Sequence, residues 1–145
     1  VRVRLFNTYG PGEFFSEYRS VIARFCYYSL HSMPYTVHLG HKRSFSYIDD
    51  TVNALANIAK TFVPGDVFNI GDSTQYDIKY VSDLIHKACG TDQSLVQYED
   101  KEELTTTEKA INNYQAQTRL GYHQSVSLEE GIARTVQWMR SVYGK

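Results

Sequence analysis

Apolar residues return every three or four positions in five stretches of the chain, and this spacing predicts five amphipathic helices. In the first stretch Val21 and Phe25 mark one face, and Ser16 stands where an N-cap is expected. Gly90 and the run Val63-Pro64-Gly65 are helix stops. The helices are expected at about 18–32, from an N-cap at Asp49 or Asp50 to about 62, at about 79–89, at about 113–120, and from Ser127 through Met139.

Short runs of alternating or β-branched residues between these helices predict strands. They are expected at 1–6, 35–39, 66–70 and 95–98, with an extended aromatic segment at 42–48. The stretch from 99 to 108 is acidic and rich in Thr, which is typical of a surface loop. Short strands that alternate with helices indicate a mixed α/β fold.

Composition narrows the class of protein. With 145 residues, of which 42% are hydrophobic, the chain is long enough for one domain with a real core. A net charge of -1 argues against nucleic acid or an anionic membrane as a partner, so any phosphate binding must be local. There is no apolar run of about eighteen residues, so no membrane span is predicted. Cys26 and Cys89 stand far apart, which fits a reducing, cytoplasmic setting without a disulfide or zinc site.

Several sequence signatures of cofactor and catalytic sites are missing from the chain. It contains no Gly-x-Gly-x-x-Gly fingerprint, no phosphate-binding Gly-x-x-x-x-Gly-Lys motif, no His-Glu-x-x-His and no Gly-x-Ser-x-Gly. The five histidines show no ligand spacing, which argues against a metal site. The chain also opens without Met, inside a predicted strand. We therefore expect a fragment or lobe of a longer protein.

Two stretches carry the candidate chemistry, and the first is 4–13. A predicted strand leads there into Asn7, Tyr9 and a Gly-Pro-Gly turn, and open α/β sheets bind ligands where strands end. The Asn7 amide is able to donate to a phosphate or sugar oxygen while it accepts from a backbone N–H. The alternative is that Asn7 only caps the turn, and Tyr9 is equally compatible with packing or with ligand contact.

The second stretch, 40–50, contains Arg43. A guanidinium fork matches two oxygens of a diphosphate, and the alternative is a surface ion pair with Asp49. Arg19 and Ser20, near the start of the first predicted helix, are further candidates for phosphate contact, because N–H groups at a helix start attract anions. Arg19 is equally compatible with an ordinary exposed arginine.

The motifs of these stretches resemble the extended short-chain dehydrogenase/reductase family, which acts on nucleotide sugars. They read Arg-x-x-Asn-x-Tyr-Gly-Pro at 4–11, Arg-x-Phe-x-Tyr-Ile-x-Asp at 43–50, Phe-Asn-Ile-Gly at 68–71 and Leu-Gly-Tyr at 120–122. The resemblance implies the carboxyl-terminal, substrate-binding lobe of an extended Rossmann-type enzyme, with short strands and four to five helices. Residues 1–145 would form this single lobe, and 1–10 would contribute a strand to the sheet of an absent amino-terminal domain.

The resemblance also implies a function. In such enzymes a tightly held NAD, bound by the amino-terminal domain, transiently oxidises the sugar at C4 with help from a Tyr-x-x-x-Lys pair. This chain contains no such pair, so no catalytic residue is expected in it. Its partners would be a nucleotide-diphosphate sugar, its own Rossmann domain and a second copy of the parent. The residues expected to contact the substrate are Asn7, Tyr9, Arg19, Ser20, Val37, Leu39, Arg43 and Phe45, with Val37 and Leu39 beside the nucleobase. The side chains of Val37 and Leu39 are equally compatible with the core of a strand.

One departure from the family's pattern leaves open how the diphosphate is bound. Relatives carry a diphosphate-binding Arg before the Leu-Gly-Trp/Tyr motif, yet 102–109 contains no Arg. Either Lys109 substitutes, or Arg43 and Arg19 hold the diphosphate alone, or the ligand is altered, or the chain is a non-catalytic nucleotide-binding or regulatory module. Within the enzyme class, an epimerase, a dehydratase and a UDP-glucuronate decarboxylase all fit. A glycine-rich fingerprint and a Tyr-x-x-x-Lys pair upstream of Val1 would favour the enzyme.

Overall fold

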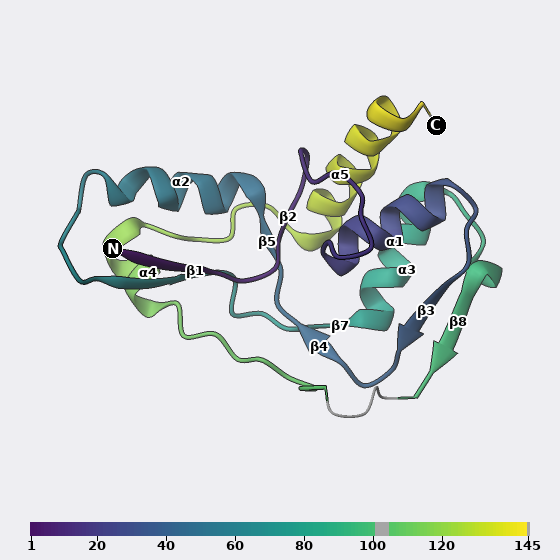
Figure 1. Cartoon of the computed structure of the whole chain (residues 1–145), viewed down its shortest axis with the longest axis horizontal. Coiled ribbons are helices and arrows are strands. Elements are labelled where there is room, and N and C mark those ends of the chain that lie inside the picture. Colours follow the sequence, from purple (N-terminus) through teal and green to yellow (C-terminus); the bar gives the residue numbers. More distant parts are fainter. Residues whose placement is uncertain (101–104, 145) are drawn as a thin grey trace.

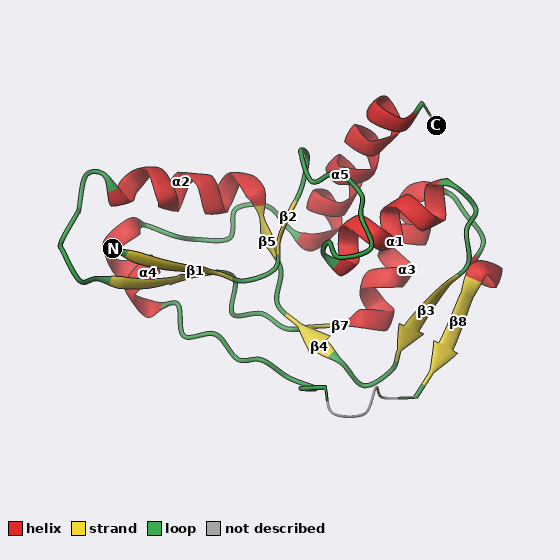
Figure 2. Cartoon of the chain, viewed as in Figure 1, coloured by secondary structure: helices red, strands yellow, loops and turns green. Residues whose placement is uncertain are grey.

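The structure is a computed structural model that describes residues 1–100 and 105–144. In this part of the chain five α-helices alternate with short strands, which confirms the expected mixed α/β class (Figures 1 and 2). The helices are α1 (Val21–Leu30), α2 (Ile48–Ile58), α3 (Ile78–Cys89), α4 (Tyr114–Leu120) and α5 (Leu128–Tyr143). The strands are β1 (Arg2–Leu5), β2 (Thr8–Tyr9), β3 (Tyr35–His38), β4 (Lys42–Arg43), β5 (Ser46–Tyr47), β6 (Val67–Ile70), β7 (Tyr76–Asp77) and β8 (Val96–Glu99), which follows a 3-10 turn at Gln93–Leu95.

The strands form four separate pairs within the described residues. β1 runs parallel to β6, β2 to β5 and β3 to β8, whereas β4 and β7 are antiparallel. Parallel partners cannot be joined by a tight turn, so each such pair joins segments that are far apart in the chain. The aromatic segment predicted at 42–48 is thus divided between two short strands and the first residue of α2.

Two apolar clusters form the interior of the described region. The larger is built mainly from α1, α3, α5 and β3 and includes Ile22, Phe25, Val37, Val81, Ile85, Ile132, Val136 and Met139. The smaller lies between the β1–β6 pair, α2 and α4 and consists of Ala54, Phe68, Ile70, Ala116, Leu120 and Tyr122. In Figure 1 the smaller cluster belongs to the left half, and β2, β5, β4 and β7 lie between the halves.

Side-chain caps determine where the helices begin. Ser20, rather than the predicted Ser16, caps α1 by accepting a hydrogen bond from the backbone N–H of Ala23, so that prediction was wrong. Asp77 caps α3, and Gly90 ends it with a positive φ, as a left-handed C-terminal residue requires. Ser127 caps α5, as predicted.

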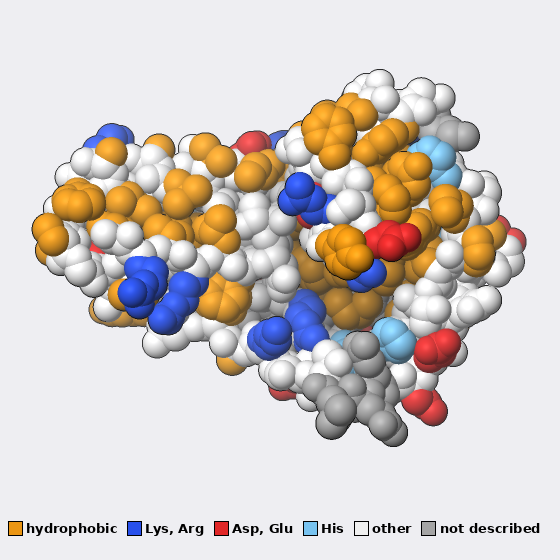
Figure 3. Space-filling view, in the orientation of Figure 1, with side chains coloured by type: hydrophobic (Ala, Val, Ile, Leu, Met, Phe, Trp, Pro, Cys, Tyr) orange, Lys and Arg blue, Asp and Glu red, His pale blue; other side chains and the backbone are white. Residues whose placement is uncertain are grey.

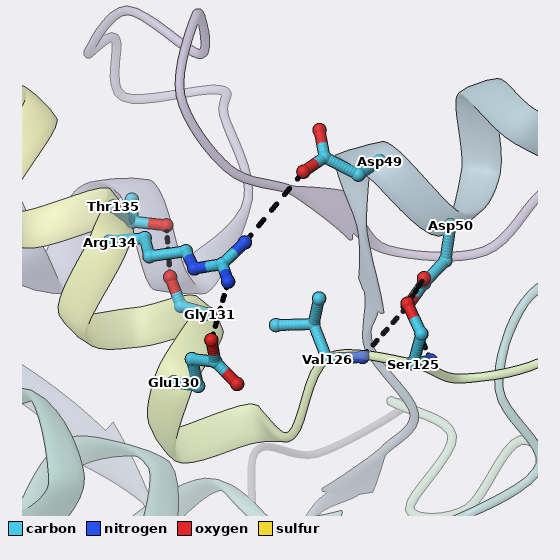
Figure 4. A network of polar contacts seen from close by, with 8 residues as sticks. All are labelled: Asp49, Asp50, Ser125, Val126, Glu130, Gly131, Arg134 and Thr135. Atoms are coloured by element: carbon cyan, nitrogen blue, oxygen red, sulfur yellow. Dashed lines mark hydrogen bonds and ion pairs between the residues drawn. The ribbon is translucent and has the colours of Figure 1, made fainter.

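Asp49 and Asp50 do not cap α2, which corrects the prediction that one of them would. Tyr47 holds the N-cap position without a side-chain bond, and both aspartates lie in the first turn. The Asp50 carboxylate is buried and accepts hydrogen bonds from the hydroxyl and N–H of Ser125 and from the N–H of Val126 (Figure 4). These bonds compensate a buried charge and fasten α2 to the segment before α5.

A close approach between α5 and the aromatic residues of β2 and β5 connects these middle strands to the right half of Figure 1. Gly131 faces Tyr9 and Tyr47, and a Cβ at this position would lie 2.2 Å from the Tyr9 hydroxyl oxygen. Tyr9 is only 2% exposed and packs edge-on against Phe45 and Tyr47. Burial raises the pKa of Tyr9 far above its usual range, so its phenol stays protonated.

A buried polar network fixes β3 against α3. The Tyr35 hydroxyl lies 2.9 Å from both the Ser82 hydroxyl and Nε2 of His86, whose Nδ1 is 2.9 Å from the Thr91 hydroxyl. Burial lowers the pKa of His86, although the charges of Asp83 and Asp92 oppose this. The folded protein therefore favours the neutral imidazole.

We predict that Gly131→Ala destabilises the fold although alanine is the better helix former. The helix propensity gain of about 1 kcal/mol should be outweighed by overpacking of about 1–3 kcal/mol against Tyr9. Urea unfolding measures the difference. Adding Tyr9→Phe removes the nearest oxygen and should restore part of the loss. A single Gly131→Ala variant as stable as the parent would contradict this packing.

We also predict that stability falls as pH drops below the ordinary His pKa of about 6.5. Because the folded state lowers the His86 pKa, the unfolded chain takes up a proton at higher pH than the folded chain does. The contribution of His86 to stability is thus fully present above about pH 6.5, and it is lost as the pH falls through the pKa of His86 in the folded protein. Thermal unfolding of the unmutated protein and of His86→Gln between pH 7 and 5 separates the contribution of His86 from that of the other histidines. An identical pH dependence in the two proteins would exclude His86 as its source.

Candidate functional site

A cavity of about 310 Å³ lies beside the start of α1, the end of β3, and β4. Figure 3 shows basic side chains gathered near the hollowed middle of one face. The described residues that line the cavity are Asn7, Arg19, Ser20, Val21, Arg24, Phe25, Thr36, His38, His41, Arg43, Phe45, Ile78 and Thr105. Five of the eight predicted substrate residues are among them, drawn from both stretches that the sequence singled out.

Asn7 stands at the turn between β1 and β2 with a φ of 43°, a left-handed conformation that Asn tolerates better than most residues. Its Nδ2 donates to the Ser44 carbonyl at 2.9 Å, and its own carbonyl accepts from the Ser46 N–H at 3.2 Å. After the hydrogen bond to Ser44, the side-chain amide has one N–H and its oxygen left for another partner. Asn7 is therefore both a structural link to the β4–β5 connection and a polar group on the cavity wall.

Arg43 is held by backbone carbonyls rather than by the predicted alternative partner, Asp49. Its Nη1 donates to the carbonyls of Lys42 at 2.7 Å and Thr107 at 2.9 Å, and Nη2 donates to that of Thr106 at 2.7 Å. Asp49 instead lies 3.8 Å from Arg134 (Figure 4). A guanidinium has five N–H donors, so Nε–H and one N–H of Nη2 remain for a ligand.

Ser20 and Arg19 reach the cavity from the start of α1. Both Glu13 oxygens bind Ser20, one at 3.0 Å from its N–H and the other at 2.8 Å from its hydroxyl. A carboxylate therefore already occupies the start of this helix, where negative charge is favourable. Arg19 is exposed and also lines a neighbouring hollow of about 420 Å³ around Gly10-Pro11-Gly12.

The remaining predicted residues differ in their placement. Phe45 is 2% exposed and forms part of the cavity lining. Tyr9 lies in the larger apolar cluster and borders the neighbouring hollow instead. Val37 is fully buried in the core. Leu39 is half-buried, and its backbone N–H donates to the Glu99 carbonyl at 2.9 Å. Neither residue is among the described residues that line the cavity. Ligand contact by any of these residues stays a prediction.

The substrate residues inferred from the motifs did not include Arg24 or the two histidines of the lining. Arg24 lies four positions after Ser20, so the two share a helix face, and this spacing was the available signal. His41 is 5% exposed, and neither ring nitrogen has a partner among the described residues. Nδ1 of His38 lies 3.8 Å from a carboxylate oxygen of Glu99, and the ring meets His41 edge-on.

The charge around the cavity is positive. Three arginines line it, and none of the described lining residues is Asp or Glu. Such a surface favours an anion and disfavours a metal ion, and residues 1–100 and 105–144 contain no cluster of three potential metal ligands. No helix in this same part of the chain is both long and apolar enough to cross a bilayer. Residues 101–104, which include the first three positions of the Arg-free stretch 102–109, lie outside the described residues.

Comparisons with known proteins support an assignment to a family. The profile of the NAD dependent epimerase/dehydratase family matches residues 1–71. The chain is 28% identical to UDP-N-acetyl-alpha-D-glucosaminuronate decarboxylase of Bacillus cytotoxicus, over 97% of this chain and 46% of the relative. It is 29% identical to dTDP-glucose 4,6-dehydratase of Streptomyces griseus, over 95% of this chain and 42% of the relative. It thus spans less than half the length of these two curated relatives.

A solved structure agrees with the sequence matches. UDP-glucose 4-epimerase of Thermotoga maritima, crystallised with UDP-glucose, superposes with a TM-score of 0.84 at 27% identity. The superposition covers 97% of this chain and 46% of the epimerase. Together, the motifs, the fold and these matches show that the chain belongs to the NAD dependent epimerase/dehydratase family, within the extended short-chain dehydrogenases/reductases.

Proposed function

We propose that this chain is the substrate-binding lobe of an NAD-dependent nucleotide-sugar enzyme and that its arginine-lined cavity holds a nucleotide-diphosphate sugar. One observation carries the proposal: Asn7 and Arg43, from separate motifs, line a single cavity that contains three arginines. A diphosphate diester carries two negative charges, and guanidinium forks match phosphate oxygens in geometry and sign. The role of the lobe is to orient the sugar for a reaction at another site.

The chemical class of the ligand follows from the lining. Arg43 retains two donors, Asn7 offers a donor and an acceptor, and Phe45 and Phe25 supply apolar surface. A few placed polar groups beside aromatic side chains are typical of a site for a small organic anion. The epimerase with the similar fold was crystallised with UDP-glucose, which supports a nucleotide sugar here.

NAD is assigned to a part of the parent protein outside this chain. A dinucleotide loop needs a strand, closely spaced glycines and a helix in direct succession. After β1 the chain instead has Asn7, then Gly10 and Gly12, and α1 begins only at Val21. These residues do not fit that loop. The cofactor would be held by a larger sheet to which residues 1–10 contribute one strand. The exposure of Leu5 on β1 and of Val1 just before it supports this arrangement.

The type of reaction stays open between epimerisation, dehydration and decarboxylation. The matched relatives are named a decarboxylase, a dehydratase and an epimerase, and all three names contain a nucleotide-linked sugar. Their shared feature is the substrate class, which is what the cavity supports. Incubating the full-length protein with UDP-glucose, dTDP-glucose and UDP-glucuronate and identifying products by mass spectrometry and NMR would assign the reaction. Binding without turnover of any nucleotide sugar would favour the non-catalytic module.

We predict that Arg43→Ala in the full-length protein weakens nucleotide-sugar binding by about 1.5–3 kcal/mol, the range for hydrogen bonds to charged groups. Titration calorimetry with whichever of UDP-, dTDP-, GDP- and CDP-glucose gives the largest thermal shift measures the loss.

Arg43→Lys is the matched control for this prediction, because it keeps the charge but loses the fork. It should bind more weakly than the parent and more tightly than Arg43→Ala. An affinity unchanged in the alanine variant would refute the assignment of Arg43 to the ligand.

A further inference from the structure

We infer that Arg24 on α1 supplies the second guanidinium of the diphosphate site, together with Arg43. It thereby fulfils the role that the arginine-free segment 102–109 leaves unfilled. This inference rests on the proposed function, because it assigns a further binding residue to the same cavity.

Arg24 is a half-buried arginine for which no partner is found in the described residues. Its Nε has almost no exposed surface and no hydrogen-bond partner, and its side chain takes part in no ion pair there. Removing a guanidinium from water without a partner costs free energy. The other arginines of the cavity differ, because Arg19 is exposed and Arg43 is bound to three carbonyls.

The helix geometry directs Arg24 toward the proposed anion. Arg24 follows Ser20 by four residues, and its backbone N–H donates to the Ser20 carbonyl at 3.1 Å. Side chains of a helix lean toward its amino terminus, so the Arg24 side chain is directed back over the turn that begins with Ser20. Both residues line the same cavity, to which Arg43 contributes from β4.

Counting donors shows why a second guanidinium is needed. Arg43 has two N–H donors left, which match two oxygens of one phosphoryl group. A diphosphate presents a second phosphoryl group with its own charge. Ser20 cannot serve it freely, because Glu13 already accepts from both its N–H and its hydroxyl. Arg24 has donors to spare and the charge that the second group requires.

The experiment compares charged and neutral ligands on the full-length protein. The probes are UDP-glucose and dTDP-glucose, with uridine and thymidine as neutral counterparts that share the base and sugar ring. The variants are Arg24→Gln, Arg24→Lys and, as a charge-matched control, Lys87→Gln on the exposed face of α3. Thermal unfolding first verifies that each variant folds.

We expect Arg24→Gln to weaken binding of the nucleotide sugar by about tenfold or more and to leave nucleoside binding within about twofold. Arg24→Lys should recover part of the loss, because it restores the charge without the fork, and Lys87→Gln should change nothing. If Arg24→Gln does not fold, Arg24→Lys alone is compared with the unmutated protein. Weaker binding of the nucleotide sugar with unchanged nucleoside binding supports the phosphate contact, because the fork is lost, and unchanged affinity for both ligands overturns it.

Two outcomes would overturn the inference alone. Equal weakening of nucleotide sugar and nucleoside would place Arg24 at the base, and unchanged affinity would make it a structural residue. In both, Arg43→Ala would still weaken binding, so the proposed function would stand. If the full-length protein bound none of UDP-, dTDP-, GDP- and CDP-glucose, the proposed function itself would fail.

Discussion

The contact between the turn at Asn7 and the segment 44–46 is the constraint on which the candidate site depends. The Asn7 side chain and carbonyl bond to Ser44 and Ser46, and β2 pairs with β5 in the same place. This junction brings Asn7 of the first motif beside the beginning of the second motif. Asn7 and Arg43 therefore line the same cavity. The junction also lies against the larger apolar cluster, because Tyr9 and Tyr47 of that cluster meet Gly131 of α5 there. Fold and site are therefore stabilised by the same few contacts.

Residues with a strong local signal were predictable from the sequence. The amphipathic helices have apolar faces that return at a fixed period, and Gly90 and Ser127 end and begin helices as their chemistry predicts. The pairs β2–β5 and β4–β7 were not predictable, because each strand has two residues and its partner is far away in the chain. Periodicity carries no information about such pairing.

Asp50 shows where the local interpretation of a residue was too narrow. A carboxylate at a helix start is usually a cap, but Asp50 is buried by long-range packing and bonds to Ser125, 75 positions away. Val37 is buried in the core, while its neighbours Thr36 and His38 line the cavity, because successive side chains of a strand point to opposite faces. Arg24 was overlooked for a similar reason, since only the placement of α1 shows which of its faces lines the cavity.

The Arg43 contacts change the meaning of the missing arginine in 102–109. The backbone of Thr106 and Thr107 binds three N–H groups of this region, two from the Arg43 guanidinium and one from the N–H of Lys42. Backbone carbonyls need no particular side chain, so this segment orients the guanidinium whatever residues it carries. An arginine fixed before the ligand arrives loses less conformational entropy on binding than a free one. Under the proposed function, the segment thus contributes preorganisation rather than charge, and the charge comes from β4 and α1.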